Sequence, residues 1–406
     1  MSPKSRNVQR KAPAARALRV AGLFAGVGGI ELGLQRAGHH AELLCEIDPA
    51  AQAVLAARFP QVPLVADVRE IKSLPAGLDM LAGGFPCQDL SQAGATRGIG
   101  GPRSGLVDQV FRLLRTHDVP RVMLENVPFM LQLRRGTAMA HIVAAFEELG
   151  YAWAYRVVDS RAFGLPQRRQ RVIMIASRVD DPAAALHGLD AGVPEDPPRD
   201  GRACGFYWTE GLRGLGWAVD AVPTLKTGSG LGIPSPPALW MPDNSIVTPD
   251  IRDAERLQGF DVDWTTPAES VKRKSYRWTL VGNAVSVNVA QWVGARLAAS
   301  INSPATSGEP ERRPLVEGRG WPQAACGAAG RRWEVEVSAF PIVAPRPPLA
   351  EFLQFPTKPL SAKATAGFLS RLEKGNLRFP REFAEALRAH LGSMTKRAPR
   401  FDMATG

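Results

Sequence analysis

The stretch LRVAGLFAGVGGIELGLQRAG, residues 18–38, decides the fold of this chain. It begins with a short, β-rich apolar run, continues through a glycine turn, and ends with the apolar spacing of an amphipathic helix. Bare glycine backbone at such a turn lets a ligand approach closely, and the N-terminus of the helix attracts negative charge. The stretch therefore predicts a strand, a ligand-binding turn and a helix, which together open an α/β domain.

Strand-like and helix-like patterns alternate from this stretch to residue 178. The strand-like runs include AELLCEID, LVADV, LDMLAGGFP, RVMLENV, YAWAYRVVDS and RVIMIAS, and the helical runs are PAAQAVLAARFP, LVDQVFRLLRTH and AMAHIVAAFEELG. Alternation of this kind predicts an α/β fold, with a mostly parallel sheet and helices on both of its faces.

Composition divides the rest of the chain. The region after residue 178 is rich in Gly, Pro, Asp and Trp, and helical pattern returns with DAERLQGF and NAVSVNVAQWVGARLAASI. SPATSGEPERRP has the composition of a linker, and two helical segments, SAKATAGFLSRLEKG and PREFAEALRAHL, lie beyond it. The predicted units are a disordered basic arm (1–17), an α/β domain (18–178), a small irregular region (179–245), a helical return segment (246–302), and a linker with a basic C-terminal extension (303–406).

The net charge of +11 is concentrated at the two ends of the chain. Residues 1–16 hold five Lys or Arg and no acid, and residues 311–406 hold 16 basic and nine acidic residues. Basic ends are typical of polyanion binding and equally of solvated tails, and both readings stay open. No apolar run approaches the roughly 20 residues of a membrane span, and no secretory segment follows the basic N-terminus, so we expect a soluble, cytoplasmic protein.

The cysteines favour neither a disulfide framework nor a metal site. Cys45, Cys87, Cys204 and Cys326 lie far apart, without a CxxC pair, and the histidines show no ligand spacing. We therefore expect no metal. A lone Cys is most often a small apolar core residue, so a reactive role for Cys87 depends on what lies near it.

Polar residues follow three successive strands. The glycine turn Phe24–Gly29 follows the first strand, Glu46 ends the second about 20 residues on, and Asp67 ends the third. In a doubly wound sheet an acid at the second position can bind ribose hydroxyls, and one at the third can accept from an adenine amino group. Together they predict an adenosine-containing cofactor, whereas a glycine turn with two helix-capping acids is the alternative.

Reactive side chains follow the next strands at the same edge. Cys87 comes after the fourth strand in GGFPCQ, and Glu125 ends the fifth in ENV. Arg169 and Arg171 precede a further strand, where alternate residues point to one face. We expect a thiol, a carboxylate and two guanidinium groups to converge at the carboxyl edge of the sheet.

Seven blocks in order carry a family resemblance over about residues 19–300. They are FAGVGG, CEID, GGFPCQ, ENV, QRRQR, RLQGF and GNAVSVNV. In this order and spacing the chain resembles the DNA (cytosine-5) methyltransferases of the bacterial modification type. The resemblance implies the Rossmann-like fold of S-adenosylmethionine-dependent methyltransferases, with a target-recognition region at 179–245 between QRRQR and RLQGF.

The resemblance also implies a mechanism. Cytosine C5 is too weakly nucleophilic to take a methyl group unaided, so Cys87 would add to C6 as a thiolate. Glu125 would protonate or hydrogen-bond N3, Arg171 would hold O2, and Arg169 would orient neighbouring groups or lower the pKa of Cys87. The target base would be flipped out of double-stranded DNA. Gln88 and the loop from Ser91 to Gly101 resemble the segment that closes over it.

Further residues are assigned by the same resemblance. Those similar to the family's contacts with the cofactor S-adenosyl-L-methionine are Phe24, Gly26, Gly28, Gly29, Glu46, Ile47, Asp67, Pro86, Asn283 and Val285. Those expected at the DNA are Gln88, Ser91, Arg97, Thr224 and Lys226. Asn283 has a structural alternative as a helix N-cap. The base-reading candidates, each with an alternative as a phosphate contact or solvated residue, are Arg199, Arg202, Arg213, Lys226 and Asn244.

The chain departs from the family in two places. Ile47 stands where an aromatic residue often packs on the adenine, and Asp250-Ile251 replaces the Thr-Pro of the block before RLQGF while Arg252-Asp253 keeps its basic–acidic pair. A tRNA methyltransferase of the same fold would carry a Cys-Phe-Thr element, which this sequence lacks. A catalytically silent DNA-binding homologue is the alternative outside the enzyme class.

The physiological setting follows from the resemblance alone. It implies a monomeric enzyme that protects host DNA within a restriction–modification or related antiphage system, associated with the nucleoid through DNA. Whether a cognate nuclease or defence partner exists is not encoded in the chain. The C-terminal extension is predicted either to clamp DNA or dock a partner from a defence system, or to pack on the catalytic domain.

Overall fold

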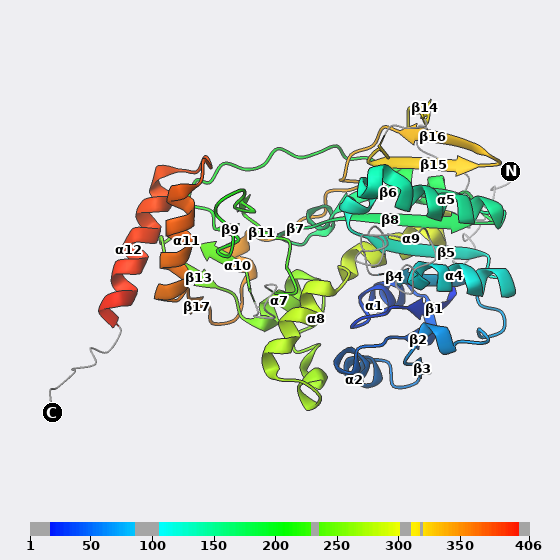
Figure 1. The fold of residues 1–406 in the computed structure, drawn as a ribbon, viewed down its shortest axis with the longest axis horizontal. Helices are drawn as coiled ribbons and strands as arrows, with labels where there is room; N and C mark the ends of the chain where they lie inside the picture. Colours follow the sequence, from blue (N-terminus) through cyan, green and yellow to red (C-terminus); the bar gives the residue numbers. More distant parts are fainter. Residues whose placement is uncertain (1–16, 86–104, 229–234, 301–309, 317–319, 398–406) are drawn as a thin grey trace, which may run out of the picture.

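The computed structural model describes residues 17–85, 105–228, 235–300, 310–316 and 320–397. Figure 1 shows a large sheet with its helices on one side of the molecule and a smaller sheet, covered by the last two helices, on the other. The short 3-10 helices are η1 (Val68–Glu70), η2 (Pro128–Leu131), η3 (Leu133–Gly136), η4 (Ser160–Phe163), η5 (Thr266–Ser270) and η6 (Lys274–Tyr276). None of the helices in these ranges has the length and apolar character to cross a membrane.

Ten strands of the described chain form the large sheet, in the order β14-β16-β15-β6-β8-β5-β4-β1-β2-β3. Its parallel half consists of β1 (Arg19–Leu23), β2 (His40–Cys45), β3 (Leu64–Val65), β4 (Met80–Gly84) and β5 (Arg121–Asn126). The antiparallel half consists of β6 (Ala152–Asp159), β8 (Gln170–Ser177), β14 (Arg312–Pro314), β15 (Ala324–Ala328) and β16 (Arg331–Val335). The predicted α/β class is confirmed, but the sheet is mixed and not mostly parallel, because β6, β8 and the three strands from residues 312–335 pair antiparallel.

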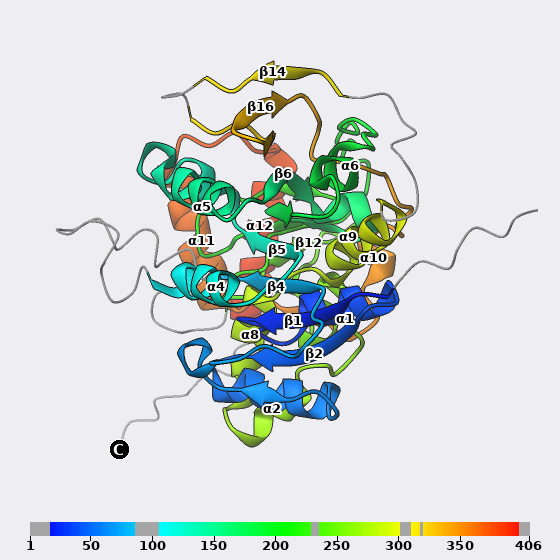
Figure 2. The ribbon, with the colours of Figure 1, turned by 90° about the vertical axis from the view of Figure 1, so that its right-hand side faces the viewer.

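Helices cover both faces of this sheet, as Figure 2 shows. One face buries apolar side chains of α4 (Gly105–Thr116) and α5 (Thr137–Glu148). The opposite face buries those of α1 (Gly29–Arg36), α6 (Pro182–His187) and α9 (Val287–Ser300). A Cβ on Gly33 of α1 would lie 2.5 Å from the Cβ of Ala290, so these two helices pack with their backbones close together.

The return segment, on which α2 packs, and a short strand pair connect this sheet to the smaller one. The helix α2 (Pro49–Arg58) packs beside residues 260–284 in one apolar cluster. The helices α7 (Ile251–Leu257) and α8 (Arg277–Asn283) lie between the two sheets (Figure 1). A short parallel pair, β7 (Gln167–Arg168) with β11 (Val222–Pro223), joins the strand of QRRQR to the region after residue 179.

The smaller sheet orders five described strands as β10-β9-β12-β13-β17. They are β9 (Cys204–Phe206), β10 (Ala218–Val219), β12 (Ala238–Trp240), β13 (Ile246–Thr248) and β17 (Lys358–Pro359). We call this sheet the recognition sheet because β9, β10 and β12 fall within the predicted target-recognition region, residues 179–245. The helices α11 (Ala362–Lys374) and α12 (Arg381–Arg397) pack on one face of this sheet. The other face shares an apolar cluster with α7, α8 and the short helix α10 (Leu349–Phe352).

The division that we predicted at residue 303 does not separate a structural unit. Residues 312–335 add three strands to the edge of the large sheet, and residues 358–397 complete the recognition sheet. The helical pattern predicted in α11 and α12 is confirmed. The described part of this extension packs on both sheets, and its predicted contact with DNA or a partner stays a prediction.

Three cysteines are buried and free. Burial raises the pKa of Cys45 to about 12 and that of Cys204 to about 11, so both thiols stay neutral. Cys45, Cys204 and Cys326 are therefore apolar core residues, as is usual for a lone cysteine. Cys87 lies outside the described residues.

Phe383 tests the assignment of α12 to the recognition sheet. Its ring contacts the rings of Phe206, Trp217, Trp240 and Phe368, and its side chain is fully buried. We expect Phe383→Ala to destabilise this unit by about 3–5 kcal/mol, measured as the shift of its urea-unfolding transition. The control is Ala389→Ser at an exposed position of the same helix, and an equal effect of both changes would contradict the packing.

Candidate active site

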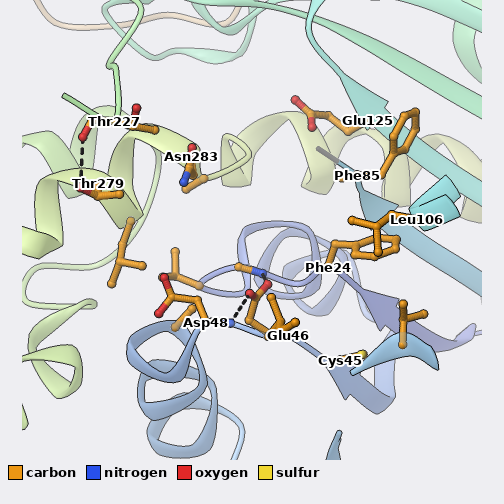
Figure 3. Close-up of a pocket in the computed structure, with 18 of the residues that line it drawn as sticks. Phe24, Cys45, Glu46, Asp48, Phe85, Leu106, Glu125, Thr227, Thr279 and Asn283 are labelled. Atoms are coloured by element: carbon orange, nitrogen blue, oxygen red, sulfur yellow. Dashed lines mark hydrogen bonds between the residues drawn. The ribbon is translucent and has the colours of Figure 1, made fainter. Parts of the chain in front are cut away.

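A cavity of about 690 Å³ opens at the carboxyl edge of the parallel strands. Figure 3 shows Glu125 and Phe85 on one side of it and Glu46 and Asp48 on the other. Its walls come from the ends of five strands (β1 to β5), from Arg171 and from two segments of the second half of the chain. The lining residues used below are Phe24, Gly26, Glu46, Ile47, Asp48, Asp67, Arg69, Phe85, Glu125, Arg171, Thr227, Thr279 and Asn283.

The glycine turn is tied to the end of β2 by Glu46. One carboxyl oxygen accepts from the Gly26 amide at 2.7 Å, and the other accepts from the Asp48 amide at 2.8 Å. Phe24 and Gly26 adopt φ of 54° and 55°, which the tight turn requires. Burial raises the pKa of Glu46, while the two amides lower it. Phe24, Gly26 and Glu46 therefore form one rigid side of the cavity.

Three of the residues predicted to bind the cofactor lie behind the cavity wall instead. A Cβ on Gly28 would lie 2.5 Å from the Phe59 ring, and one on Gly29 would lie 2.4 Å from the Val285 carbonyl oxygen. Gly28, Gly29 and Val285 are absent from the residues that line the described cavity. Gly28 and Gly29 let α1 begin and pack closely, while the cofactor contacts predicted for all three residues stay predictions.

The second and third strands supply acids and an apolar surface. Ile47 lines the cavity with 66% of its side chain exposed, so an apolar face is available where the family often has an aromatic one. Asp48 caps α2 and accepts from the Tyr276 hydroxyl at 2.5 Å. Asp67 is paired with Arg69, whose hydrogen bonds lower the pKa of the carboxyl.

Glu125 and Arg171 form the ion pair at the other end of the cavity. Arg171 Nε lies 2.8 Å from Glu125 Oε1, and both side chains are nearly buried. Burial raises the pKa of Glu125, an effect that the charges of Arg171 and Arg169 oppose. Burial also lowers the pKa of Arg171, and Glu125 counteracts this. The carboxyl is therefore placed to hold a proton more readily than an exposed glutamate.

Arg169 is buried behind this pair, with 1% of its surface exposed, and does not line the cavity. Its guanidinium donates to the carbonyls of Leu225 at 3.1 Å, Gly282 at 3.2 Å and Ala284 at 2.7 Å. Burial lowers its pKa well below the usual value. Of the convergence we predicted, Glu125 and Arg171 meet in the cavity, whereas Arg169 braces the wall.

The predicted residues Pro86, Cys87, Gln88, Ser91 and Arg97 lie outside the described residues. The described chain stops short of them at Phe85, which lines the cavity and whose carbonyl accepts from the Asn126 amide side chain at 3.0 Å. This hydrogen bond joins the ends of β4 and β5 at the cavity edge.

Asn283 lines the cavity and is exposed. It is the last residue of α8, and the next helix, α9, begins at Val287. The alternative of an N-cap is therefore wrong, because the chain is extended between these helices and Ser286, not Asn283, directly precedes α9.

Thr224 and Lys226 belong to a segment that borders the cavity. The Thr224 hydroxyl donates to the Arg168 carbonyl at 2.9 Å. Lys226 lies 3.6 Å from the centre of the Tyr207 ring and is ion-paired with Glu210. Both predicted DNA residues thus have partners within the protein.

Sequence analysis missed two threonines in the cavity wall. Thr227, next to Lys226, lines the cavity, and its carbonyl accepts from the Thr279 hydroxyl at 3.0 Å (Figure 3). The position of Thr227 directly after Lys226, which we expected at the DNA, was the available signal. Thr279 gave none, because its contact joins residues 52 positions apart.

The other base-reading candidates differ in their surroundings. Arg199 stacks 3.3 Å from the centre of the Trp240 ring, and Asn244 accepts from the Trp240 indole at 3.0 Å. Arg202 donates to the Pro198 carbonyl, and Arg213 is exposed. Arg199 and Asn244 thus support the recognition sheet through Trp240.

Comparison with known proteins identifies the family. A family model for C-5 cytosine-specific DNA methylases matches residues 18–200. The Type II methyltransferase M2.BsuMI of Bacillus subtilis strain 168 is 47% identical over 387 residues, which are 91% of this chain and 97% of that protein. The chain belongs to the C-5 cytosine-specific DNA methylase family. The DNA (cytosine-5) methyltransferase activity implied by the seven motifs is confirmed at this level.

Other matches to this DNA methylase are partial or structural. The Type II methyltransferase M.BanI of Aneurinibacillus aneurinilyticus is 37% identical over 40% of this chain and 39% of that protein. The Entamoeba histolytica methyltransferase EhMeth and the S. pombe Dnmt2 methyltransferase each superpose with a TM-score of 0.52 at 16% identity. They cover 71% and 70% of this chain and all of theirs, which supports the fold alone.

Glu31 is a buried acid close to the glycine turn that the sequence did not single out. It lies in the first turn of α1, with 2% of its surface exposed, and neither carboxyl oxygen has a hydrogen-bond partner in the described structure. Burial, with the charge of Glu46 adding to it, raises the pKa of Glu31 to about 8. A neutral carboxyl is therefore built into the core below the turn.

This acid makes stability depend on pH. Between the ordinary pKa of 4.5 and about 8, the folded protein keeps a proton that the unfolded chain has lost. The free energy of unfolding therefore falls as pH rises through this window, by at most about 1.4 kcal/mol per pH unit. We expect Glu31→Gln to raise the melting temperature relative to wild type progressively from pH 5 to pH 8, measured by calorimetry.

Glu42 is the matched control for this measurement. It pairs with Arg19, which lowers the pKa of Glu42, so its stabilising charge is present above the ordinary pKa. Glu42→Gln should therefore shift the melting temperature by a constant amount between pH 6 and 8. A constant shift for Glu31→Gln as well would contradict the neutral carboxyl.

Proposed function

We propose that this DNA methylase transfers a methyl group from S-adenosyl-L-methionine to C5 of a cytosine flipped out of a specific short duplex sequence. The observation that carries the proposal is the nearly buried Glu125–Arg171 pair at one end of a cavity whose other end is acidic. A base can reach such a pair only after it has left the stack.

The cavity fits the proposed cofactor by its donor set. Glu46, Asp48 and Asp67 line one half of it, beside the apolar surfaces of Phe24 and Ile47. S-adenosylmethionine carries a sulfonium and an ammonium charge, ribose hydroxyls and a flat adenine, which acidic and apolar groups complement. The residues that would hold it are Phe24, Gly26, Glu46, Ile47, Asp67 and Asn283. When bound, the cofactor supplies an electrophilic methyl group.

The chain's own residues would prepare the cytosine. The Cys87 thiolate adds to C6, and the electron pair of the C5–C6 double bond is drawn toward N3. Glu125 donates a proton to N3, and Arg171 donates to O2, so that the ring becomes nucleophilic at C5. After methylation N3 returns its proton to Glu125 and water accepts the C5 proton. The electron pair of the broken C5–H bond forms the C5–C6 double bond as Cys87 leaves C6 as a thiolate, which restores the free enzyme.

Arg169 acts in this proposal as a positioning residue. Its three hydrogen bonds hold Leu225, Gly282 and Ala284, which carry the cavity wall from Thr227 to Asn283. Its charge also reaches Glu125, whose pKa it lowers. This differs from a direct contact with the substrate, which Arg171 is placed to make.

Recognition of DNA is proposed for the region from residue 179 to 245 together with the recognition sheet. Thr224 and Lys226 border the cavity, and Gln88, Ser91 and Arg97 follow the nucleophile in sequence. We assign the first pair to the duplex beside the flipped base and the other three to the segment that closes over it.

The biological role that we propose is host protection. M2.BsuMI and M.BanI are named Type II methyltransferases, which supports modification of DNA within a restriction–modification or related antiphage system. Double-stranded DNA is the partner in this reading, and a cognate defence component is a further one. We propose a monomer acting on cytoplasmic, nucleoid DNA.

The first experiment is bisulfite sequencing of DNA from a methylation-free host that expresses this protein. We expect 5-methylcytosine at one short motif with wild type and none with Cys87→Ala, because Cys45, a described thiol that lines the cavity, lies away from Glu125 (Figure 3) and has its pKa raised by burial. Cys204→Ala, in the core of the recognition sheet, is the matched control and should retain the motif. Methylation by Cys87→Ala at the wild-type level would refute the proposed nucleophile.

A second prediction addresses the cofactor. Glu46→Ala removes the acceptor of two amides and the proposed ribose contact, so the dissociation constant of S-adenosylhomocysteine should rise about tenfold or more. Isothermal titration without DNA measures it, with Glu42→Ala on the same strand as the control. Unchanged affinity in Glu46→Ala would place the adenosyl group elsewhere.

A further inference from the structure

One segment of the C-terminal extension crosses from the large sheet to the recognition sheet. We call residues 344–360 the strap. It begins where the Ala344 amide donates to the Ala162 carbonyl at 2.9 Å, beside the large sheet. It ends in β17, which pairs with β13 of the recognition sheet. Figure 1 shows this orange path between the two units.

The first anchor of the strap is Asp220. Its two carboxyl oxygens accept from the Leu349 amide at 2.8 Å and from Arg346 Nη1 at 3.1 Å. The same Arg346 nitrogen donates to the Asp220 carbonyl oxygen at 2.6 Å. Asp220 directly follows β10, which is an edge strand of the recognition sheet, so this anchor fixes the strap at that edge.

The second anchor is Asp253 of α7, whose side chain is 0% exposed. Its oxygens accept from the backbone amides of Gln354 and Phe355, each at 3.0 Å, and from Arg256 at 2.8 Å. A buried carboxylate is stable only when such donors surround it, so α7 and the strap depend on each other here. Arg252 adds a stacking contact 4.0 Å from the centre of the Phe355 ring.

The altered block before RLQGF lies next to these contacts. Asp250 caps α7 in place of the family's Thr-Pro, while the retained pair Arg252-Asp253 faces the strap. The departure noted in the sequence therefore coincides with the place where this chain receives its own C-terminal segment.

Between the two anchors, α10 fills the space between the recognition sheet and the helices α7 and α8. Leu349 is 0% exposed, and with Phe352 it belongs to the apolar cluster that contains Leu225, Leu257 and Val281. Leu225 is also the residue whose carbonyl Arg169 holds, two positions before Thr227 of the cavity wall. Packing of the strap is thereby continuous with the wall.

We propose that the strap sets the position of the recognition sheet over the cavity, and that Asp253 is the positioning residue that holds it. No strap residue is among those that line the described cavity, so its effect on the reaction is indirect. The inference rests on the proposed function and predicts that loss of an anchor impairs the use of duplex DNA while cofactor binding persists.

The test compares full-length wild type, Asp253→Asn and Leu349→Ala. An asparagine at 253 turns an amide group toward one strap N–H, and an alanine at 349 leaves a gap in the α10 contact. The control is Asp118→Asn. It removes an exposed carboxylate in the loop before β5, at the opposite end of that strand from Glu125. Steady-state methylation gives KM for duplex DNA and kcat, and calorimetric titration without DNA gives the dissociation constant of S-adenosylhomocysteine.

We expect the KM for DNA to rise about tenfold in Asp253→Asn, because a hydrogen bond to a buried charge is lost, with cofactor affinity within about twofold of wild type. Leu349→Ala should show the same combination of a raised KM for DNA and an unchanged cofactor affinity. If Asp253→Asn does not fold, the result with Leu349→Ala decides whether the strap has the proposed role. An unchanged KM for DNA in a folded variant overturns the strap's role.

A parallel loss of cofactor affinity in both variants also overturns it, since the strap would then support the whole fold and not the recognition sheet. If the wild-type protein methylates no DNA, the proposed function itself is overturned. That result does not depend on the variants. Activity in wild type and the control, with the split confined to the two strap variants, supports the inference.

Discussion

The buried guanidinium of Arg169 is the interaction on which the arrangement of the site depends. It joins the strand of QRRQR to a carbonyl of the recognition region and to two carbonyls of the return segment. These three parts lie up to 115 residues apart along the chain, and a charge buried this deeply requires its acceptors to stay in place. The cavity wall and the Glu125–Arg171 pair lie beside Arg169. The strap is linked to it through Leu225, whose carbonyl Arg169 holds and whose side chain belongs to the apolar cluster of Leu349.

The sequence predicted the parts of this enzyme that follow from local pattern. The glycine turn, the acid after each of the next two strands and the carboxylate at the end of β5 occupy the cavity because parallel strands bring their carboxyl ends to one edge. It also predicted cofactor contacts for Gly28, Gly29 and Val285, which are not among the residues that line the described cavity, and the two glycines serve the packing of α1. A sequence motif alone does not distinguish a residue that contacts a ligand from one that packs against a neighbouring helix.

Long-range pairing was beyond the reach of the sequence. The strand β15 reads AACGA, without alternation, and β17 has two residues, so neither shows a period that predicts a strand. Both form because a sheet edge in a distant part of the chain is available to them. The roles of Thr279, Asp220 and Asp253 depend on the same distant contacts, and for that reason no local signal marked them.

The recognition sheet is assembled from two pieces of chain separated by more than a hundred residues. Phe206 and Trp240 come from the first piece, and Phe368 and Phe383 from the second, and they stack in one core. In the proposed function, the part that reads the DNA sequence is therefore not one contiguous segment of the chain. Recombination that exchanged only the central piece between two such enzymes would match a new sheet with the old helices, so a change of target through gene shuffling must carry the 3′ end of the gene with it.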